Sequence, residues 1–311
     1  MQNLAKRPRR NRSSGWVRGL VQENRLDVSD VICPLFICEG ESQKQDIASL
    51  PDIYRYSIDM LVEQAKICED LGIPAVALFP CVAEDKKDHQ GSEALNPDNL
   101  MCRAIQAIKK ETKNLGVITD VALDPYTNHG HDGILEDGKV LNDETVEMLA
   151  EQAVVQAQAG ADIIAPSDMM DGRVAKIRDL LELNDFKDVK IMSYAVKYAS
   201  SFYGPFRDAV GSGNILKGDK KTYQMNPCNV DEAVIEAELD VQEGADMVIV
   251  KPGLPYLDVI KTVKDKVQAP VFAYHVSGEY AMLRAAAQKG WLNYEDSLME
   301  SLIAFKRAGC S

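Results

Sequence analysis

Two lysines stand at the ends of strongly apolar runs, a setting in which a lysine can become a nucleophile. Lys197 closes the run IMSYAVK and Lys251 closes the run DMVIVK. Partial burial and a second cation nearby both lower the pKa of an ammonium group, and a neutral amine can attack a carbonyl carbon. The alternative is a lysine that extends into solvent or pairs with a carboxylate. Two such lysines on successive expected strands indicate Schiff-base chemistry.

A loop rich in carboxylates and histidines follows one of the apolar runs. Within thirteen residues it carries three carboxylates and two histidines, at Asp120, Asp124, His129, His131 and Asp132. Such a set could hold a divalent ion or support proton transfers, and the lack of cysteine excludes a structural zinc site of the thiolate kind. The alternative is a solvated turn that uses Asp and Gly for backbone reasons.

A third segment, about 203–222, is long, glycine-rich and basic, with its cations at Arg207, Lys217, Lys220 and Lys221. Long irregular loops in compact domains are typically lids or binding loops. The cations could bind a substrate carboxylate and close over it, or they could be the solvated charges of a surface loop. The residues alone therefore indicate an enzyme that forms a lysine Schiff base with a small anionic carbonyl compound, in an aldolase-like or dehydratase-like reaction.

Short apolar runs alternate with segments of helical periodicity along the chain. We expect strands at 31–37, 75–79, 117–123, 162–165, 190–196, 246–250 and 270–276. The clearest helical segments end at glycines, namely Gly72, Gly160 and Gly244. This alternation predicts parallel strands joined by crossovers, with helices covering the outer face.

The expected architecture is an α/β barrel of the TIM (β/α)8 type over residues 16–311. A doubly wound open sheet is the competitor, but no glycine-rich phosphate-binding motif follows the first strand. In such a barrel the active site forms at the carboxyl ends of the strands, where both lysines stand. Only seven strands are evident, and Gly309 lies where an eighth strand would begin. We therefore expect the eighth strand to be missing.

The composition limits the classes of function. The chain has 311 residues, of which 35 are Lys or Arg and 48 are Asp or Glu, for a net charge of −13. An acidic surface repels nucleic acid and anionic lipid, and no apolar run is long enough to cross a bilayer. An odd set of seven cysteines indicates free thiols in a reducing compartment, the cytosol.

The first 15 residues are basic and polar and are expected to form an arm outside the core. The positive charge of this arm on an acidic chain predicts that it docks on a neighbouring subunit. The alternative is a frayed terminus.

Together these segments resemble the porphobilinogen synthase (5-aminolevulinate dehydratase) family. The resemblance covers residues 7–309 and is carried by the segments 7–12, 120–133, 165–172, 193–207, 250–257 and 274–279. It implies condensation of two 5-aminolevulinate molecules into porphobilinogen with loss of two waters, in tetrapyrrole and heme biosynthesis. The remaining alternatives are a Schiff-base aldolase, which needs only one essential lysine, and an inactive subunit of such an assembly.

The resemblance also implies roles for individual residues. Lys251 matches the principal Schiff-base lysine and Lys197 the second active-site lysine. The lid residues Arg207 and Lys220, with Gln224 beside them, match positions that bind one substrate carboxylate. Ser277 matches a residue that binds the other carboxylate, and Tyr203 and Phe206 match aromatic residues that line the site.

Metal use and assembly are implied in the same way. Zinc-dependent members carry three cysteines where this chain has Ala122, Asp124 and Asp132. No catalytic zinc is therefore expected, and the two aspartates are expected to position the substrate amine and assist proton transfer. Glu236 matches an allosteric Mg²⁺ position, and the family assembles as homo-octamers with the arm around a neighbour. Family members continue past Gly309 into an eighth strand that also supplies a substrate-binding tyrosine.

Overall fold

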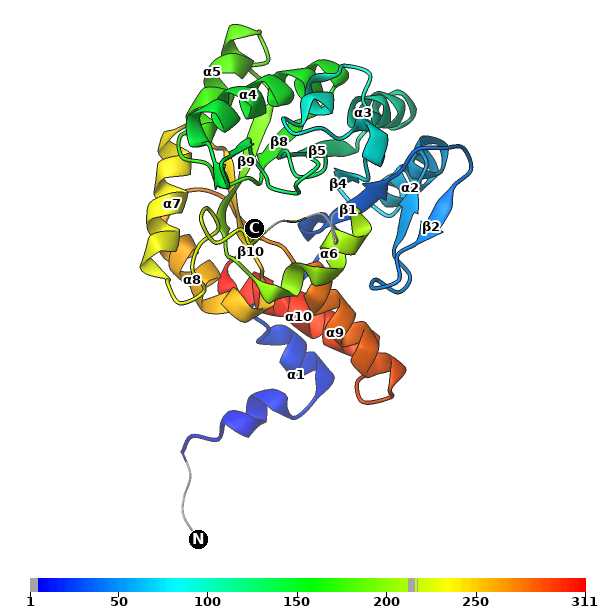
Figure 1. Cartoon of the computed structure of the whole chain (residues 1–311). Coiled ribbons are helices and arrows are strands. Elements are labelled where there is room, and N and C mark those ends of the chain that lie inside the picture. Colours follow the sequence, from blue (N-terminus) through cyan, green and yellow to red (C-terminus); the bar gives the residue numbers. More distant parts are fainter. Residues whose placement is uncertain (1–4, 212–215, 217) are drawn as a thin grey trace.

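The computed structural model describes residues 5–211, 216 and 218–311, so residues 1–4 of the expected arm and parts of the expected lid lie outside the described residues. Seven parallel strands form the body of the molecule (Figure 1). In sheet order they are β1 (Ile32–Ile37), β4 (Ala75–Pro80), β5 (Gly116–Val121), β8 (Ile163–Pro166), β9 (Lys190–Lys197), β10 (Met247–Lys251) and β11 (Val271–Ala273). These are the seven strands expected from the sequence, with bounds that differ by at most a few residues.

The order of these strands decides between the two expected architectures. Neighbours among these seven strands follow one another along the chain, with no reversal of order. A doubly wound sheet requires such a reversal at its switch point, whereas a barrel does not. The fold is therefore of the α/β barrel type.

Helices surround the strands on the outside (Figure 1). Their bounds are α2 (Ile58–Asp70), α3 (Leu100–Glu111), α4 (Asn142–Ala159), α5 (Arg173–Leu183), α7 (Asp231–Gln242), α8 (Leu257–Lys266) and α10 (Tyr294–Ala308). Side chains alternate along each strand between these helices and the barrel interior. Inward positions such as Phe36, Ile118, Met192 and Ile249 form an inner core, and outward positions such as Val76 pack under the helices.

Several short elements had no signal in the sequence. A strand pair, β2 (Lys44–Asp46) and β3 (Tyr54–Tyr56), extends the sheet beyond β1, and a hairpin of β6 (Leu135–Glu136) and β7 (Lys139–Val140) follows the aspartate-rich loop. Outside the barrel, α1 (Gly15–Leu20) lies below α10 in Figure 1. No helix of the described part of the chain is long and apolar enough to span a bilayer.

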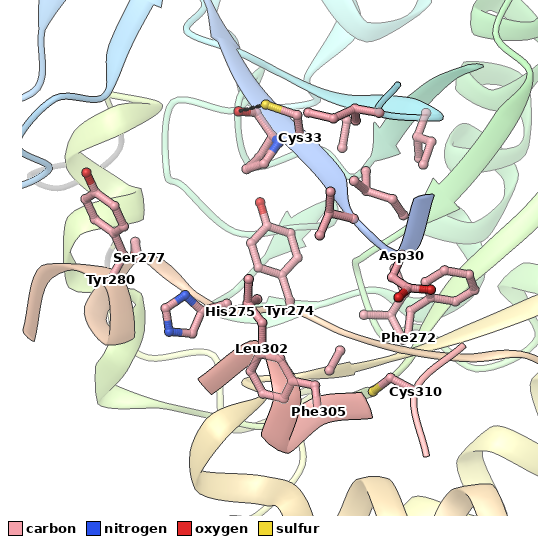
Figure 2. Close-up of a pocket in the computed structure, with 18 of the residues that line it drawn as sticks. Asp30, Cys33, Phe272, Tyr274, His275, Ser277, Tyr280, Leu302, Phe305 and Cys310 are labelled. Carbon is pink, nitrogen blue, oxygen red and sulfur yellow. Dashed lines mark hydrogen bonds between the residues drawn. The ribbon is translucent and has the colours of Figure 1, made fainter. Parts of the chain in front are cut away.

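The strands β11 and β1 are not paired with each other, and the described residues contain no strand between them. The Ser311 N–H donates to the Val271 carbonyl on the free edge of β11, at 2.9 Å. A largely apolar cavity of about 460 Å³ opens here and extends into the barrel. Figure 2 shows Cys33 of β1 on one side of this cavity, with Phe272, Phe305 and Cys310 on the other.

Candidate active site

Lys251 ends β10 with its amine enclosed by four aromatic rings. Its side chain is buried, and Nζ lies 4.6 Å from the ring centre of Tyr274, 4.8 Å from Tyr194, 5.0 Å from Phe206 and 5.6 Å from Tyr203. We call these four rings the aromatic box. Burial and the charge of Lys197 lower the pKa of Lys251 from 10.5 to about 7. A substantial fraction of this amine is therefore neutral at neutral pH, as nucleophilic attack requires.

Lys197 ends the neighbouring strand β9 and is paired in register with Lys251. This alignment places both lysines at the same end of two adjacent strands, as the sequence predicted. The Lys197 amine donates to the Ser167 carbonyl and lies 3.7 Å from the Asp132 carboxylate. The two amines therefore differ in setting, because Lys197 has polar and acidic partners while Lys251 is surrounded by rings.

Asp124 and Asp132 face each other across a lysine. Lys220 Nζ lies 3.2 Å from Asp124 Oδ2 and 2.9 Å from Asp132 Oδ2. Burial raises the pKa of Asp124, with Lys220 opposing this effect. Burial would also raise the pKa of Asp132, but Lys220 and Lys197 outweigh it and hold that pKa at about 2. Asp132 is thus an anion at neutral pH, and the ammonium group of Lys220 offsets the negative charge of the two aspartates.

Asp120 is a further acidic group of the site; in the sequence it belongs to the loop rich in carboxylates and histidines, with no role of its own indicated. Burial raises the pKa of Asp120 to about 6, against the opposing charges of Lys251 and Lys197. Asp120 lies on β5 two residues after Ile118, whose side chain belongs to the inner core. Alternation along this strand was the signal that could have assigned Asp120 to the interior. The same alternation, read from Met192 and Phe272, indicates Tyr194 and Tyr274.

The expected lid is anchored to the site at its first residue and again just after its last. Tyr203 Oη donates to the Lys251 carbonyl at 3.0 Å, and Met225 N–H donates to the Lys197 carbonyl at 3.0 Å. Gln224, the residue before Met225, is buried, and its N–H donates to the Lys220 carbonyl. The tip, residues 212–215 and 217, lies outside the described residues.

Two of the expected carboxylate-binding residues lie on short or terminal helical segments beside the aromatic box, Arg207 in the last turn of its helix and Ser277 at the start of its helix. Arg207 is on α6 (Gly204–Ala209), directly after Phe206, and makes no ion pair within the described residues. Ser277 is the first residue of α9 (Ser277–Gln288), and its Oγ accepts the Phe206 N–H at 2.9 Å.

Glu236 lies apart from this group, half-buried on the outer helix α7. Burial raises the pKa of Glu236, with nearby Arg173 opposing and the carboxylates of Asp240 and Asp171 adding to the effect. No cluster of three or more His, Cys, Asp or Glu side chains suited to a metal is found among the residues that the structure describes.

The assembled groups can carry out carbonyl–amine condensation. A neutral amine lies in a low-polarity pocket, an acid with a pKa of about 6 lies nearby for proton exchange, and cations and a hydroxyl are placed to bind carboxylates.

Comparison with known proteins agrees with this chemistry. The family model described as delta-aminolevulinic acid dehydratase matches residues 5–311. The chain is 59% identical over 307 residues to delta-aminolevulinic acid dehydratase of Bradyrhizobium diazoefficiens, covering 99% of this chain and 87% of the relative. It is 51% identical to that of Rhodobacter capsulatus, covering 98% and 92%. The solved structure of the Toxoplasma gondii ME49 protein with porphobilinogen is similar, with a TM-score of 0.97 and 49% identity over 99% of this chain and 88% of that one.

Proposed function

The chain belongs to the delta-aminolevulinic acid dehydratase family, and from that premise we propose that it condenses two molecules of 5-aminolevulinate into porphobilinogen and two waters. The observation that carries the proposal is the pair Lys251 and Lys197, aligned on adjacent strands with one amine in the aromatic box. The T. gondii relative was solved in complex with porphobilinogen, which supports the same product here.

In the proposed reaction the neutral Lys251 amine attacks the ketone carbon of one substrate. A proton is delivered to the resulting hydroxyl, water leaves, and a carbon–nitrogen double bond to the lysine remains. Asp120, with a pKa of about 6, is the nearby group able to donate and then recover that proton. The lysine is released when the pyrrole ring closes, so the two waters of the balanced reaction account for both ketone oxygens.

Lys197 holds the second substrate beside the first, either through an imine or through its ammonium group. Holding both molecules on adjacent strands converts a bimolecular condensation into a nearly unimolecular one. Asp132 and Asp124 position the cationic amine of a substrate and assist proton transfer. The low pKa of Asp132 keeps it an anion that attracts the amine, whereas the raised pKa of Asp124 suits that carboxyl to exchange protons.

We assign two sets of residues to the two substrate carboxylates. Arg207 and Lys220, with Gln224, bind one of them, and Ser277 binds the other. Lys220 pairs with Asp124 and Asp132 in this structure, so binding of a substrate carboxylate would shift part of the Lys220 charge away from these aspartates. Tyr203 and Phe206 close the pocket around Lys251.

We infer a zinc-independent type of enzyme with Mg²⁺ as an allosteric ion. Asp124 and Asp132 offer hard oxygen donors and no thiolate, which is a poor donor set for zinc. Glu236, with the neighbouring carboxylates of Asp171 and Asp240, has an excess of negative charge that a hydrated Mg²⁺ would offset. Bound beside Glu236 on the outer helix α7, the ion would neutralise these carboxylates away from the substrate pocket.

We also propose a homo-octamer in a reducing compartment, the cytosol. The arm is exposed and basic at Arg7, Arg9, Arg10 and Arg12, and α1 exposes Trp16 and Leu20. Basic and apolar surface of this kind on an acidic chain is suited to a neighbouring subunit. The seven cysteines are free thiols, consistent with reducing conditions.

Borohydride trapping tests the proposed function. Reduction in the presence of 5-aminolevulinate should attach substrate to Lys251, and colorimetric detection should reveal porphobilinogen in the unreduced reaction. A folded sample with no adduct on either Lys251 or Lys197, and no porphobilinogen, would refute the proposal. Cleavage of a sugar phosphate with an adduct on one lysine only would indicate an aldolase instead.

A further inference from the structure

Glu279 is a fully buried carboxylate without a basic partner. It is the third residue of α9, has a relative exposure of 0%, and forms no ion pair within the described residues. Its Oε1 accepts the Leu254 N–H at 2.5 Å, and its Oε2 accepts the Val276 N–H at 2.6 Å. Burying an anion away from cations is costly, so these hydrogen bonds from backbone N–H groups must offset much of the desolvation penalty.

The two oxygens of Glu279 hold two parts of the proposed active site together. Leu254 follows Lys251 by three residues, in the segment that continues the Schiff-base strand β10. Val276 immediately precedes Ser277, the residue proposed to bind a substrate carboxylate. A single side chain therefore connects the main chain after the nucleophile to the main chain before the carboxylate site.

The surrounding backbone leaves little room for these segments to shift. A Cβ added at Gly253 would lie 2.7 Å from the Phe305 ring, and one added at Gly278 would lie 2.5 Å from the Phe202 carbonyl oxygen. Ser277 Oγ also donates to that carbonyl, at 3.3 Å. The start of α9 is thus in close contact with the segment that leads into the lid.

We propose that Glu279 is a positioning residue that fixes the separation between the Lys251 amine and the Ser277 hydroxyl, so that one 5-aminolevulinate molecule spans both. This inference rests on the proposed function and deepens it. A substrate covalently bound at its ketone can reach Ser277 with its carboxylate only over a narrow range of separations, because two methylene groups join the ketone to the carboxylate. Burial raises the pKa of Glu279 to about 7, and three backbone N–H groups oppose this rise because they favour the ionised form.

Glu279→Gln tests this role, because the amide keeps the size of the side chain but can accept hydrogen bonds on one side only. We expect KM for 5-aminolevulinate to rise about 10- to 100-fold, as for a lost hydrogen bond to a charged group. The borohydride adduct on Lys251 should still form at high substrate concentration, since the aromatic box is unchanged. Glu279→Asp keeps the charge but shortens the reach, and should raise KM in the same direction by less.

Glu69→Gln is the matched control. Glu69 also accepts two backbone N–H groups, those of Lys113 and Asn114, both on its Oε1, and it lies on the outer helix α2. This variant should leave KM and kcat unchanged, and melting curves of all variants would report any general loss of stability.

The Ser277→Ala background makes the test specific. If Glu279 acts through Ser277, Glu279→Gln should raise KM less than about two-fold once the hydroxyl is absent, a non-additive result. A folded Glu279→Gln or Glu279→Asp protein with unchanged KM, or full additivity with Ser277→Ala, would overturn the inference while leaving the proposed function standing. Absence of adduct and product in the unmodified protein would instead refute the proposed function.

Discussion

The reactivity of Lys251 should depend on the charge of Lys197. With a pKa of about 7, about half of the Lys251 side chains are neutral at pH 7, whereas at the ordinary value of 10.5 roughly 1 in 3,000 would be. Burial is the larger cause of this shift and the Lys197 charge the second. Lys197→Met keeps the burial of Lys251 and removes the neighbouring charge, so the pKa of Lys251 should rise. The neutral fraction of Lys251 at pH 7 should then fall from about one half toward, but not as far as, roughly 1 in 3,000.

The assay must isolate the first covalent step, because Lys197 is itself proposed to act in the complete reaction. The initial rate of borohydride trapping on Lys251, located by peptide mass mapping, should fall at pH 7 in Lys197→Met, and its pH midpoint should move to higher pH. Lys221→Met is the control, since it also removes a lysine charge, in the expected lid, but the Lys221 side chain is 75% exposed. An unchanged trapping rate and midpoint in Lys197→Met would refute the proposed electrostatic activation.

Three further outcomes are expected. Asp120→Asn should lower kcat about 100-fold or more and abolish the fall of the rate as pH rises through about 6, because the deprotonated carboxylate cannot donate the proton; porphobilinogen formation in a protein shown to be folded measures both effects. Lys251→Met should stabilise the folded state by about 1–4 kcal/mol at pH 7, because the lowered pKa of Lys251 opposes folding. The difference in stability should be largest below pH 7 and vanish above about pH 10.5. A melting temperature lower than that of the unmodified protein at pH 7 would contradict this expectation. A chelator selective for Zn²⁺ over Mg²⁺ should leave activity unchanged, whereas an activity that only zinc restores would contradict the roles of Asp124 and Asp132.

The barrel and its two lysines could be predicted because the relevant signals are local. Each lysine ends a continuous apolar run, and strands of that kind must lie side by side under helices. The alignment of Lys197 with Lys251 then follows from the parallel order of β9 and β10. The strands β2, β3, β6 and β7 have two or three residues each, too few for any periodicity to be visible.

The pairing of side chains across the site could not be predicted in the same way. Lys220 and Asp124 are 96 residues apart, and only the fold brings them together. Glu279 has no local signal either, because a glutamate in the first turn of a helix is usually a solvated residue near the helix dipole. Its burial depends on Leu254 and Val276, whose proximity is a property of the tertiary structure.

The aromatic box has a consequence after the covalent bond has formed. The faces of four rings attract positive charge, namely those of Tyr194, Tyr203, Phe206 and Tyr274. A protonated imine carries a positive charge, and this charge stays in the pocket as long as the covalent bond to the lysine lasts. The aromatic box surrounds a neutral amine before the reaction, and it would stabilise the iminium ion that replaces this amine. Saturated analogues that carry a positive charge at the position of the imine should therefore dissociate more slowly than uncharged saturated analogues of the same shape.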